Sequence, residues 1–203
     1  MLGLLVAADV AVRGVAESQL EDRVEAQVAT QGGADVRISS FPFLGRLLTS
    51  GAVGHVRVSA AEVTAERLTF TLVSLDLEEV RFDRSSLLSD RMVVLESLER
   101  GTAVAELTQD RLSDLLGVDV TLEAGQVRVR VAGQSVTAAA SVTDNTLRVT
   151  VAGVTVPALR IPRLSLLPCV ADAEVLAGRI RLTCEVDELP ADLVGRPLAE
   201  LTP

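Results

Sequence analysis

The sequence is poor in aromatic residues, with four Phe and neither Tyr nor Trp among 203 residues. Sites for sugars and for single-stranded nucleic acids both use aromatic side chains as stacking platforms. Lysine is absent as well, so all 19 basic residues are Arg, and 28 acidic residues outnumber them. At a net charge of −9 the chain repels polyanions. These shortages exclude nucleic acid as a partner and argue against a dedicated glycan site.

Residues that build catalytic or metal sites are also scarce. The single histidine, His55, excludes a two-histidine metal site and would have to serve in any Ser–His–Asp triad. It lies in a strand-like stretch, in step with Val53 and Arg57, which favours a surface or half-buried strand residue. No nucleophile elbow, zinc-binding helix motif, phosphate-binding loop, dinucleotide-binding glycine pattern or calcium loop occurs. We therefore expect no enzymatic activity, no metal and no cofactor.

The two cysteines, Cys169 and Cys184, flank a stretch that is typical of a β-hairpin. If the turn centres on Leu176-Ala177, the cysteines face each other, whereas a bulge at Gly178 would shift the register by one residue. A bridge would close a loop of roughly 15 residues, worth ~3 kcal/mol in the chain-entropy model. We expect a Cys169–Cys184 disulfide and an oxidising compartment; two reduced, buried thiols in the cytosol are the alternative.

Long hydrophobic runs are missing too. Residues 1–8 are apolar, but Asp9 ends the run far short of the ~20 residues that a spanning helix needs. The run also lacks the basic beginning of a signal peptide. We interpret residues 1–8 as the remnant of an N-terminal signal or anchor, with an ordinary helix start as the alternative. Residues 9–203 are then expected to form a single domain.

What the chain does have is apolar character, with 48% hydrophobic residues and a mean hydropathy of +0.38, so it folds around a sizeable core. From Ala8 to Thr30 an apolar residue recurs every four positions, which predicts an amphipathic helix. Its apolar stripe is narrow, which suggests a helix lying across a sheet. The stripe consists of Val12, Ala16, Leu20, Val24 and Val28.

Strand-like alternation dominates the rest of the chain. It begins at Asp35–Ser39, continues from Val56 to Leu107, and gives way to a second short helix at Gln109–Leu116. Valine-rich strands from Val118 to Val151, joined by short Gly or Asn turns, predict a four-stranded antiparallel meander. A helical tail is expected at Ala191–Leu201. The pattern predicts an α+β domain with a long antiparallel sheet.

A family resemblance enters at Ser40-Phe41-Pro42-Phe43-Leu44, followed by Leu47-Leu48-Thr49-Ser50-Gly51. This segment resembles that of the LmeA-like phospholipid-binding family of actinobacterial cell-envelope proteins. The amphipathic helix before it, the helix at Leu112–Leu116 and the valine-rich meander are also similar to the family. The resemblance implies a tubular lipid-binding type of fold, in which a curved sheet wraps a long helix.

The resemblance also implies a function. It implies an exported or N-terminally anchored protein on the periplasmic side of the cell envelope that binds phosphoinositide-like phospholipids and supports lipoglycan assembly. Phospholipid and a membrane surface are then the expected partners, with an envelope membrane enzyme as a further one. Two other functions stay open: a scaffold that stabilises such an enzyme through a sheet edge or apolar patch, and an enzyme such as an esterase or glycosyltransferase.

Candidate lipid-binding residues lie in the same Phe-rich segment. Pro42 interrupts regular structure, and a short helix is expected from Leu44 to Thr49. We expect an entrance or docking surface for lipid here, and the alternative is a plug that seals the end of the sheet. Arg46 is the candidate for the lipid phosphate, with a solvated loop arginine as its alternative. The apolar candidates are Phe41, Phe43, Leu44, Leu47 and Leu48.

Overall fold

The computed structural model describes most of the chain: residues 2–27, 30–65, 68–90, 92–131, 133–143, 146–151, 154–155, 159–160, 172–188, 191 and 194–195. In the first half of the chain the elements are α1 (Leu2–Gln27), β1 (Ala34–Ile38), α2 (Phe43–Ser50), β2 (Ala52–Ala65), β3 (Leu68–Phe82), the π-helical turn η1 (Ser86–Asp90), β4 (Leu95–Ser97) and β5 (Arg100–Thr108). They continue with α3 (Gln109–Leu116), β6 (Asp119–Glu123), β7 (Gln126–Val131), β8 (Gln134–Thr143), β9 (Thr146–Val151), β10 (Val154–Thr155), β11 (Leu159–Arg160), β12 (Asp172–Leu176) and β13 (Arg179–Val186).

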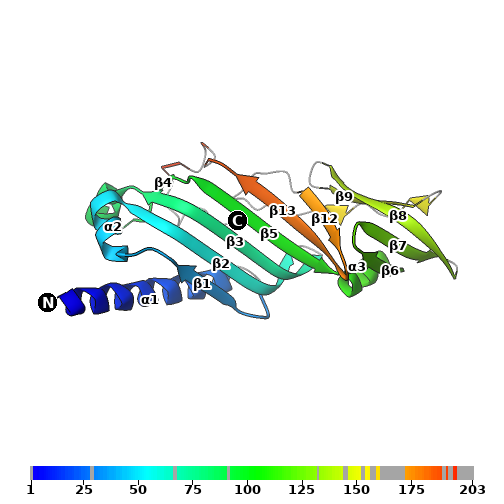
Figure 1. Cartoon of the computed structure of the whole chain (residues 1–203), viewed down its shortest axis with the longest axis horizontal. Coiled ribbons are helices and arrows are strands. Elements are labelled where there is room, and N and C mark those ends of the chain that lie inside the picture. Colours follow the sequence, from blue (N-terminus) through cyan, green and yellow to red (C-terminus); the bar gives the residue numbers. More distant parts are fainter. Residues whose placement is uncertain are drawn as a thin grey trace.

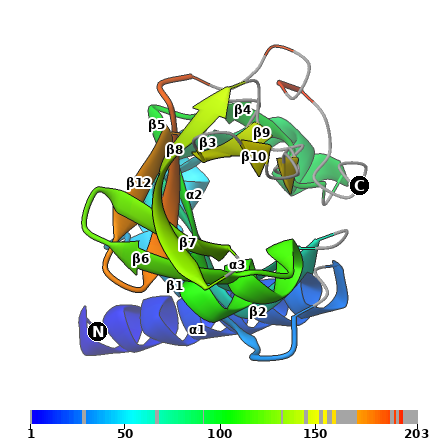
Figure 2. The ribbon, with the colours of Figure 1, turned by 90° about the vertical axis from the view of Figure 1, so that its right-hand side faces the viewer.

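The strands of the described structure form two antiparallel sheets. The larger has the order β1-β2-β3-β5-β13-β12, with β4 paired to β3, and the smaller has the order β10-β9-β8-β7-β6, with β11 paired to β9. The sheets follow each other along the long axis (Figure 1), and their strands curve in an open arc when viewed along that axis (Figure 2). The predicted α+β class with a long, curved antiparallel sheet is confirmed.

The main hydrophobic core lies where the two sheets meet around α3. Leu112 of α3 is fully buried, and Ile180 of β13, with Val127 and Val129 of β7, is only 1% exposed. The turn before β13 fixes this junction, because the Gly178 N–H donates to the Leu122 carbonyl and the Gly178 carbonyl accepts from the Gln109 N–H. The predicted meander is confirmed as β6–β9, and the predicted second helix as α3.

The narrow apolar stripe suggested that α1 lies across the sheet, but α1 lies beside the edge of the sheet instead. It runs alongside the edge strand β1 and contacts α2 (Figure 1). Ala16 and Leu20 of the stripe pack half-buried against the cluster of Ile38, Phe43 and Val53, while Val12 stays 42% exposed. The free edge of β1 determines this position, because its N–H groups donate to carboxylates of α1.

The long hairpin β2–β3 keeps its apolar residues on one side by skipping the strand alternation twice. Val53 and Val56 pack in the same cluster although they lie three residues apart, and Phe70 and Val73 do so further along. The skips coincide with Glu79 and Glu62, the non-glycine residues found with positive φ, at 47° and 51°. His55 is therefore out of step with Val53, contrary to the simple parity of the sequence.

The hairpin between the cysteines is present as β12 and β13, but its turn is not at Leu176-Ala177, the position that would place the two cysteines opposite each other. The turn residues are Ala177-Gly178, with Gly178 at φ 76°, because the left-handed backbone of a two-residue turn suits glycine. Thr183 consequently pairs with Asp172, and Cys184 lies opposite Ala103 of β5. Cys169 lies outside the described residues, as does most of the expected tail at Ala191–Leu201, so the disulfide stays a prediction.

Candidate functional site

An uninterrupted aliphatic face extends over the larger sheet. Residues paired across antiparallel strands point to the same side, so the strand register shows which side chains share this face. In β5 the register brings three small residues between the larger side chains of β3 and β13. The aliphatic face comprises Val36 and Ile38 (β1), Val56, Val58 and Ala60 (β2), Val73, Leu75 and Leu77 (β3), Gly101, Ala103 and Ala105 (β5), and Leu182, Cys184 and Val186 (β13).

The centre of this face is incompletely covered within the described part of the chain. Its end near α2 is closed by Leu95 and Leu98, which pack with Val80 against Val56 and Leu77. Further along, Val58, Val73 and Leu75 are only half-buried, although they are large aliphatic residues. Partly exposed Val and Leu side chains provide the lining that an acyl chain requires, and burying that chain gains about 0.8 kcal/mol per methylene.

The opposite face of the same sheet is polar. His55 Nε2 lies 2.8 Å from one carboxylate oxygen of Asp76, and Arg57 donates to the other oxygen at 2.6 Å. A hollow of about 450 Å³ lies here, and Arg100 and Glu78 also line it. Each charged group in this hollow already has a partner, and no group of three metal-binding side chains occurs in the described residues. His55 therefore lies half-buried on β2, in contact with the Asp76 carboxylate.

The Phe-rich segment divides into a buried part and an exposed part. Phe43 is only 4% exposed and forms a cluster with Ile38 and Val53, against which Leu44 and Leu47 pack. Phe41 is 67% exposed and Leu48 is 49% exposed. The expected short helix is present as α2. Phe43, Leu44 and Leu47 thus pack as a plug would, whereas Phe41 and Leu48 are exposed, and lipid contact at these residues stays a prediction.

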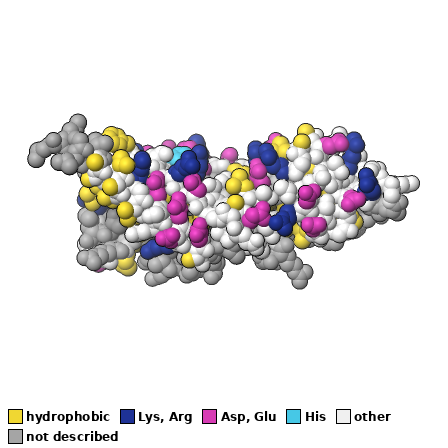
Figure 3. All heavy atoms as spheres, turned by 90° about the horizontal axis from the view of Figure 1, so that it is seen from below, with side chains coloured by type: hydrophobic (Ala, Val, Ile, Leu, Met, Phe, Trp, Pro, Cys, Tyr) yellow, Lys and Arg dark blue, Asp and Glu magenta, His cyan; other side chains and the backbone are white. Residues whose placement is uncertain are grey.

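The exposed residues belong to an apolar tip, which we define as Val10, Phe41 and Leu48. Val10, in the first half of α1, is 49% exposed. Hydrophobic side chains gather at this end of the molecule, while acidic and arginine side chains spread over the rest of the same face (Figure 3). The one acidic residue near the start of α1, Asp9, is buried. Exposed apolar side chains that gather at one end of an otherwise charged surface are typical of a contact site for another apolar surface.

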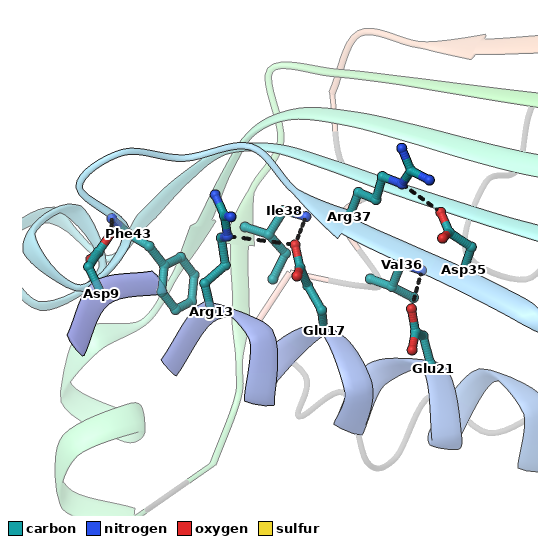
Figure 4. A network of polar contacts seen from close by, with 9 residues as sticks. All are labelled: Asp9, Arg13, Glu17, Glu21, Asp35, Val36, Arg37, Ile38 and Phe43. Atoms are coloured by element: carbon teal, nitrogen blue, oxygen red, sulfur yellow. Dashed lines mark hydrogen bonds and ion pairs between the residues drawn. The ribbon is translucent and has the colours of Figure 1, made fainter. Parts of the chain in front are cut away.

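Carboxylates of α1 hold this end together (Figure 4). Asp9 accepts hydrogen bonds from the N–H groups of Phe43 and Leu44, at 3.0 and 2.7 Å. Those groups are the first donors of α2, and the N-cap residue Pro42 offers no side-chain acceptor for them. Asp9 therefore fixes the position of α2, and with it that of Phe41 and Leu48.

The same helix closes the free edge of β1 with a ladder of three glutamates. Glu17, Glu21 and Glu25 accept hydrogen bonds from the N–H groups of Ile38, Val36 and Ala34, at 2.7, 3.0 and 3.0 Å (Figure 4 shows the first two). Four helical residues rise about 6 Å and two strand residues about 6.8 Å, so the spacings match. Helix α3 covers the edge of β6 in the same way. The side chains of Gln109 and Ser113 accept hydrogen bonds from the N–H groups of Leu122 and Val120, both at 3.0 Å. Both edges are thereby protected against pairing with another chain.

Arg46 has a carboxylate partner inside the fold. Its Nη2 donates to both oxygens of Glu79, at 2.8 and 2.7 Å, and its guanidinium packs over Gly54, where a Cβ would lie 2.9 Å from Nη1. The Arg46–Glu79 ion pair connects α2 to β3 at the residue where the alternation of side chains along β3 is interrupted. The role of Arg46 in binding a lipid phosphate stays a prediction, and binding would compete with Glu79.

Sequence reasoning missed a second arginine near the tip. Arg84 follows β3 and donates from Nη1 to the Thr49 carbonyl at 2.6 Å, at the end of α2. It lines an open pocket of about 460 Å³, together with Thr49, Ser50, Phe82, Asp83, Ser85, Ser89 and Glu96. These residues come from three separate segments, so no local pattern in the sequence could have assembled them.

One of three comparisons with known proteins, the comparison with protein families, finds a match. No curated protein and no solved structure matches the chain. Among the described residues, none of the helices is both long and apolar enough to cross a membrane. The family described as LmeA-like phospholipid-binding matches residues 7–195, which is nearly the whole chain and includes the aliphatic face, α2 and the ladder. The chain therefore belongs to the LmeA-like phospholipid-binding family.

Proposed function

We propose that the protein binds a phospholipid without catalysis and that the acyl chains lie on the aliphatic face. The observation that carries the proposal is the row of small residues in β5, Gly101, Ala103 and Ala105, between rows of larger aliphatic side chains. Branched and aliphatic side chains without polar groups suit a flexible acyl chain. The family description supports a phospholipid as the ligand.

We place this activity in the cell envelope, on its periplasmic side, with the protein exported or N-terminally anchored. The apolar residues 1–8 and the expected Cys169–Cys184 disulfide support this placement. Phosphoinositide-like lipids are the proposed ligands, and support of lipoglycan assembly is the proposed role. The apolar tip would face the membrane, because it is the exposed apolar surface beside α2.

The alternative is a scaffold that stabilises an envelope membrane enzyme. At β1 and β6 a scaffold acting through a sheet edge is disfavoured, because side chains of α1 and α3 cover these two edges. A scaffold acting through an apolar patch could use the tip, so Phe41 and Leu48 support both functions. The aliphatic face separates them, since only a lipid-binding protein needs it to be accessible.

Native mass spectrometry with organic extraction tests the proposed function. The protein is incubated with phosphatidylinositol vesicles, separated from them, and examined for bound lipid. We expect one or a few phospholipid molecules per chain. Protein that leaves the vesicles without lipid, in repeated preparations, would contradict the proposal.

Two adjacent residues of β3 provide matched variants for this experiment. Leu75 lies on the aliphatic face, whereas Ser74 lies on the polar face. Leu75→Asn should reduce the bound lipid severalfold, and Ser74→Asn should leave it unchanged. Thermal unfolding of both variants confirms that they fold. Equal lipid uptake by the folded variants would place the acyl chains elsewhere.

A further inference from the structure

Arg84 differs from the other arginines that line pockets of the described structure. Arg57, Arg100, Arg128 and Arg130 each have a carboxylate partner within 3.6 Å. Arg84 has none among the described residues, and only its Nη1 is engaged, by the carbonyls of Thr49 and Leu48. Its remaining N–H groups are available to a ligand, in the fork geometry that suits a phosphate.

The pocket is rich in groups that recognise hydroxyl-bearing molecules. Thr49 and Ser50 bring hydroxyls that donate to carbonyls of α2, at 2.6 and 2.8 Å, and can still accept from a ligand. Ser89 brings a third hydroxyl, and Glu96 brings a carboxylate that has no partner in the described structure. A carboxylate accepts hydrogen bonds from hydroxyl groups but repels a bare phosphate. The mixture of Arg84 with Glu96 therefore fits a phosphodiester whose other end carries hydroxyls.

A second acid in the pocket, Asp83, serves the protein itself. Its carboxylate accepts from the Ser85 N–H, the Ser85 hydroxyl and the Ser86 hydroxyl, at 2.9, 2.7 and 2.6 Å. These bonds, led by that of Ser86, lower the pKa of Asp83 from 3.8 to about 2. Asp83 is thus ionised at neutral pH and adds to the unfavourable field for a multiply charged anion.

The position of the pocket relates it to the membrane. Thr49 and Ser50 follow directly after Leu48 of the apolar tip, and Phe82 joins the pocket to the cluster around Phe43. A tip that contacts a bilayer would hold the pocket near the lipid head groups. A head group is therefore a nearer source of phosphate than the solution.

We propose that the Arg84 pocket, lined by Thr49, Ser50, Phe82, Arg84, Ser89 and Glu96, binds the head group of a membrane phospholipid. Arg84 binds the phosphodiester, and Glu96 accepts from hydroxyls of the head group. This proposal rests on the proposed phospholipid-binding function and adds the place and chemistry of head-group recognition.

Vesicle co-sedimentation tests the proposal on the full chain. Wild type, Arg84→Gln and Arg81→Gln are compared on phosphatidylcholine vesicles with and without phosphatidylinositol. Arg81 is an exposed arginine without a described partner, lines none of these pockets and loses the same charge. We expect Arg84→Gln to weaken binding to the phosphatidylinositol vesicles about tenfold, as loss of a charged hydrogen bond does, and Arg81→Gln to weaken it less than twofold. An equal loss in both variants, or in neither, would overturn the proposal.

Two further measurements separate the remaining outcomes. Arg84 also supports α2, so Glu96→Gln provides a second variant, one that removes no internal hydrogen bond. Glu96→Gln should reduce the preference for phosphatidylinositol over phosphatidic acid severalfold. An unchanged preference would refute the role of Glu96. Inorganic phosphate at matched ionic strength should not displace the vesicles, and full displacement would assign the pocket to free phosphate. If wild type binds lipid and Arg84→Gln behaves identically, this proposal fails alone. If wild type binds no lipid at all, the proposed function fails with it.

Discussion

Phe41 and Phe43 are separated by one proline, and replacing each by alanine is expected to affect a different property. Phe43→Ala should reduce stability, and Phe41→Ala should reduce membrane binding. Phe43 is 4% exposed and contacts the Ile38–Val53 cluster, so Phe43→Ala leaves a cavity between α2 and the sheet. Truncations of this kind cost roughly 3–5 kcal/mol. For a domain of this size, the melting temperature should fall by roughly 6–20 °C.

Phe41→Ala is the matched control for stability and the test variant for membrane contact. Because Phe41 is 67% exposed, the change should alter the free energy of unfolding by less than about 0.5 kcal/mol. Loss of its apolar surface from a bilayer contact should cost between about 1 and 2 kcal/mol, or about tenfold in vesicle binding.

Urea unfolding and vesicle co-sedimentation measure the two effects on the same preparations. Phe43→Ala is predicted to shift the unfolding midpoint strongly, and Phe41→Ala is predicted to shift only vesicle binding. If both variants unfold like wild type, the buried plug is refuted. If Phe41→Ala binds vesicles as wild type does, the tip does not contact the membrane.

Three further predictions concern the ladder, the turn after β3 and the cysteines. Glu21→Ala leaves the Val36 N–H without its acceptor and should lower the free energy of unfolding by about 1–2 kcal/mol, while the exposed neighbour Asp22→Ala should change it little; equal urea midpoints would contradict the ladder. Because folding lowers the pKa of Asp83 to about 2, its contribution is present above about pH 4 and is lost as the pH falls towards 2. The difference in melting temperature between wild type and Asp83→Asn should therefore shrink over that interval, and a constant difference would refute this cause. Intact-mass analysis with alkylation should show Cys169 and Cys184 modified only after reduction, and two alkylated cysteines in unreduced, denatured protein would exclude the disulfide.

The sequence allowed the meander and α2 to be predicted because local patterns determine both. Alternating valines with two-residue turns specify β6 and β7 regardless of their surroundings. Likewise, Leu44, Leu47 and Leu48 follow helical spacing immediately after a proline. The family resemblance, resting on the same segment, was confirmed over residues 7–195.

Other features depend on partners that become known only with the strand order. Glu17, Glu21 and Glu25 lie off the apolar stripe of α1, and nothing in the sequence reveals that β1 is an edge strand with free N–H groups. The side on which His55 lies depends on the skip at Glu79, a backbone feature without a residue signature. The Arg84 pocket is assembled from three segments of the chain, which only the fold brings together.

Photocrosslinking tests most directly whether acyl chains lie on the aliphatic face. The protein is loaded with a phospholipid that carries a diazirine in its acyl chain, separated from vesicles, irradiated and mapped by peptide mass spectrometry. We expect labels at the half-buried residues Val58, Val73 and Leu75, and none at Arg57, Ser74 or Asp76 on the opposite face. Labels confined to the polar face or to the apolar tip would contradict the proposed site.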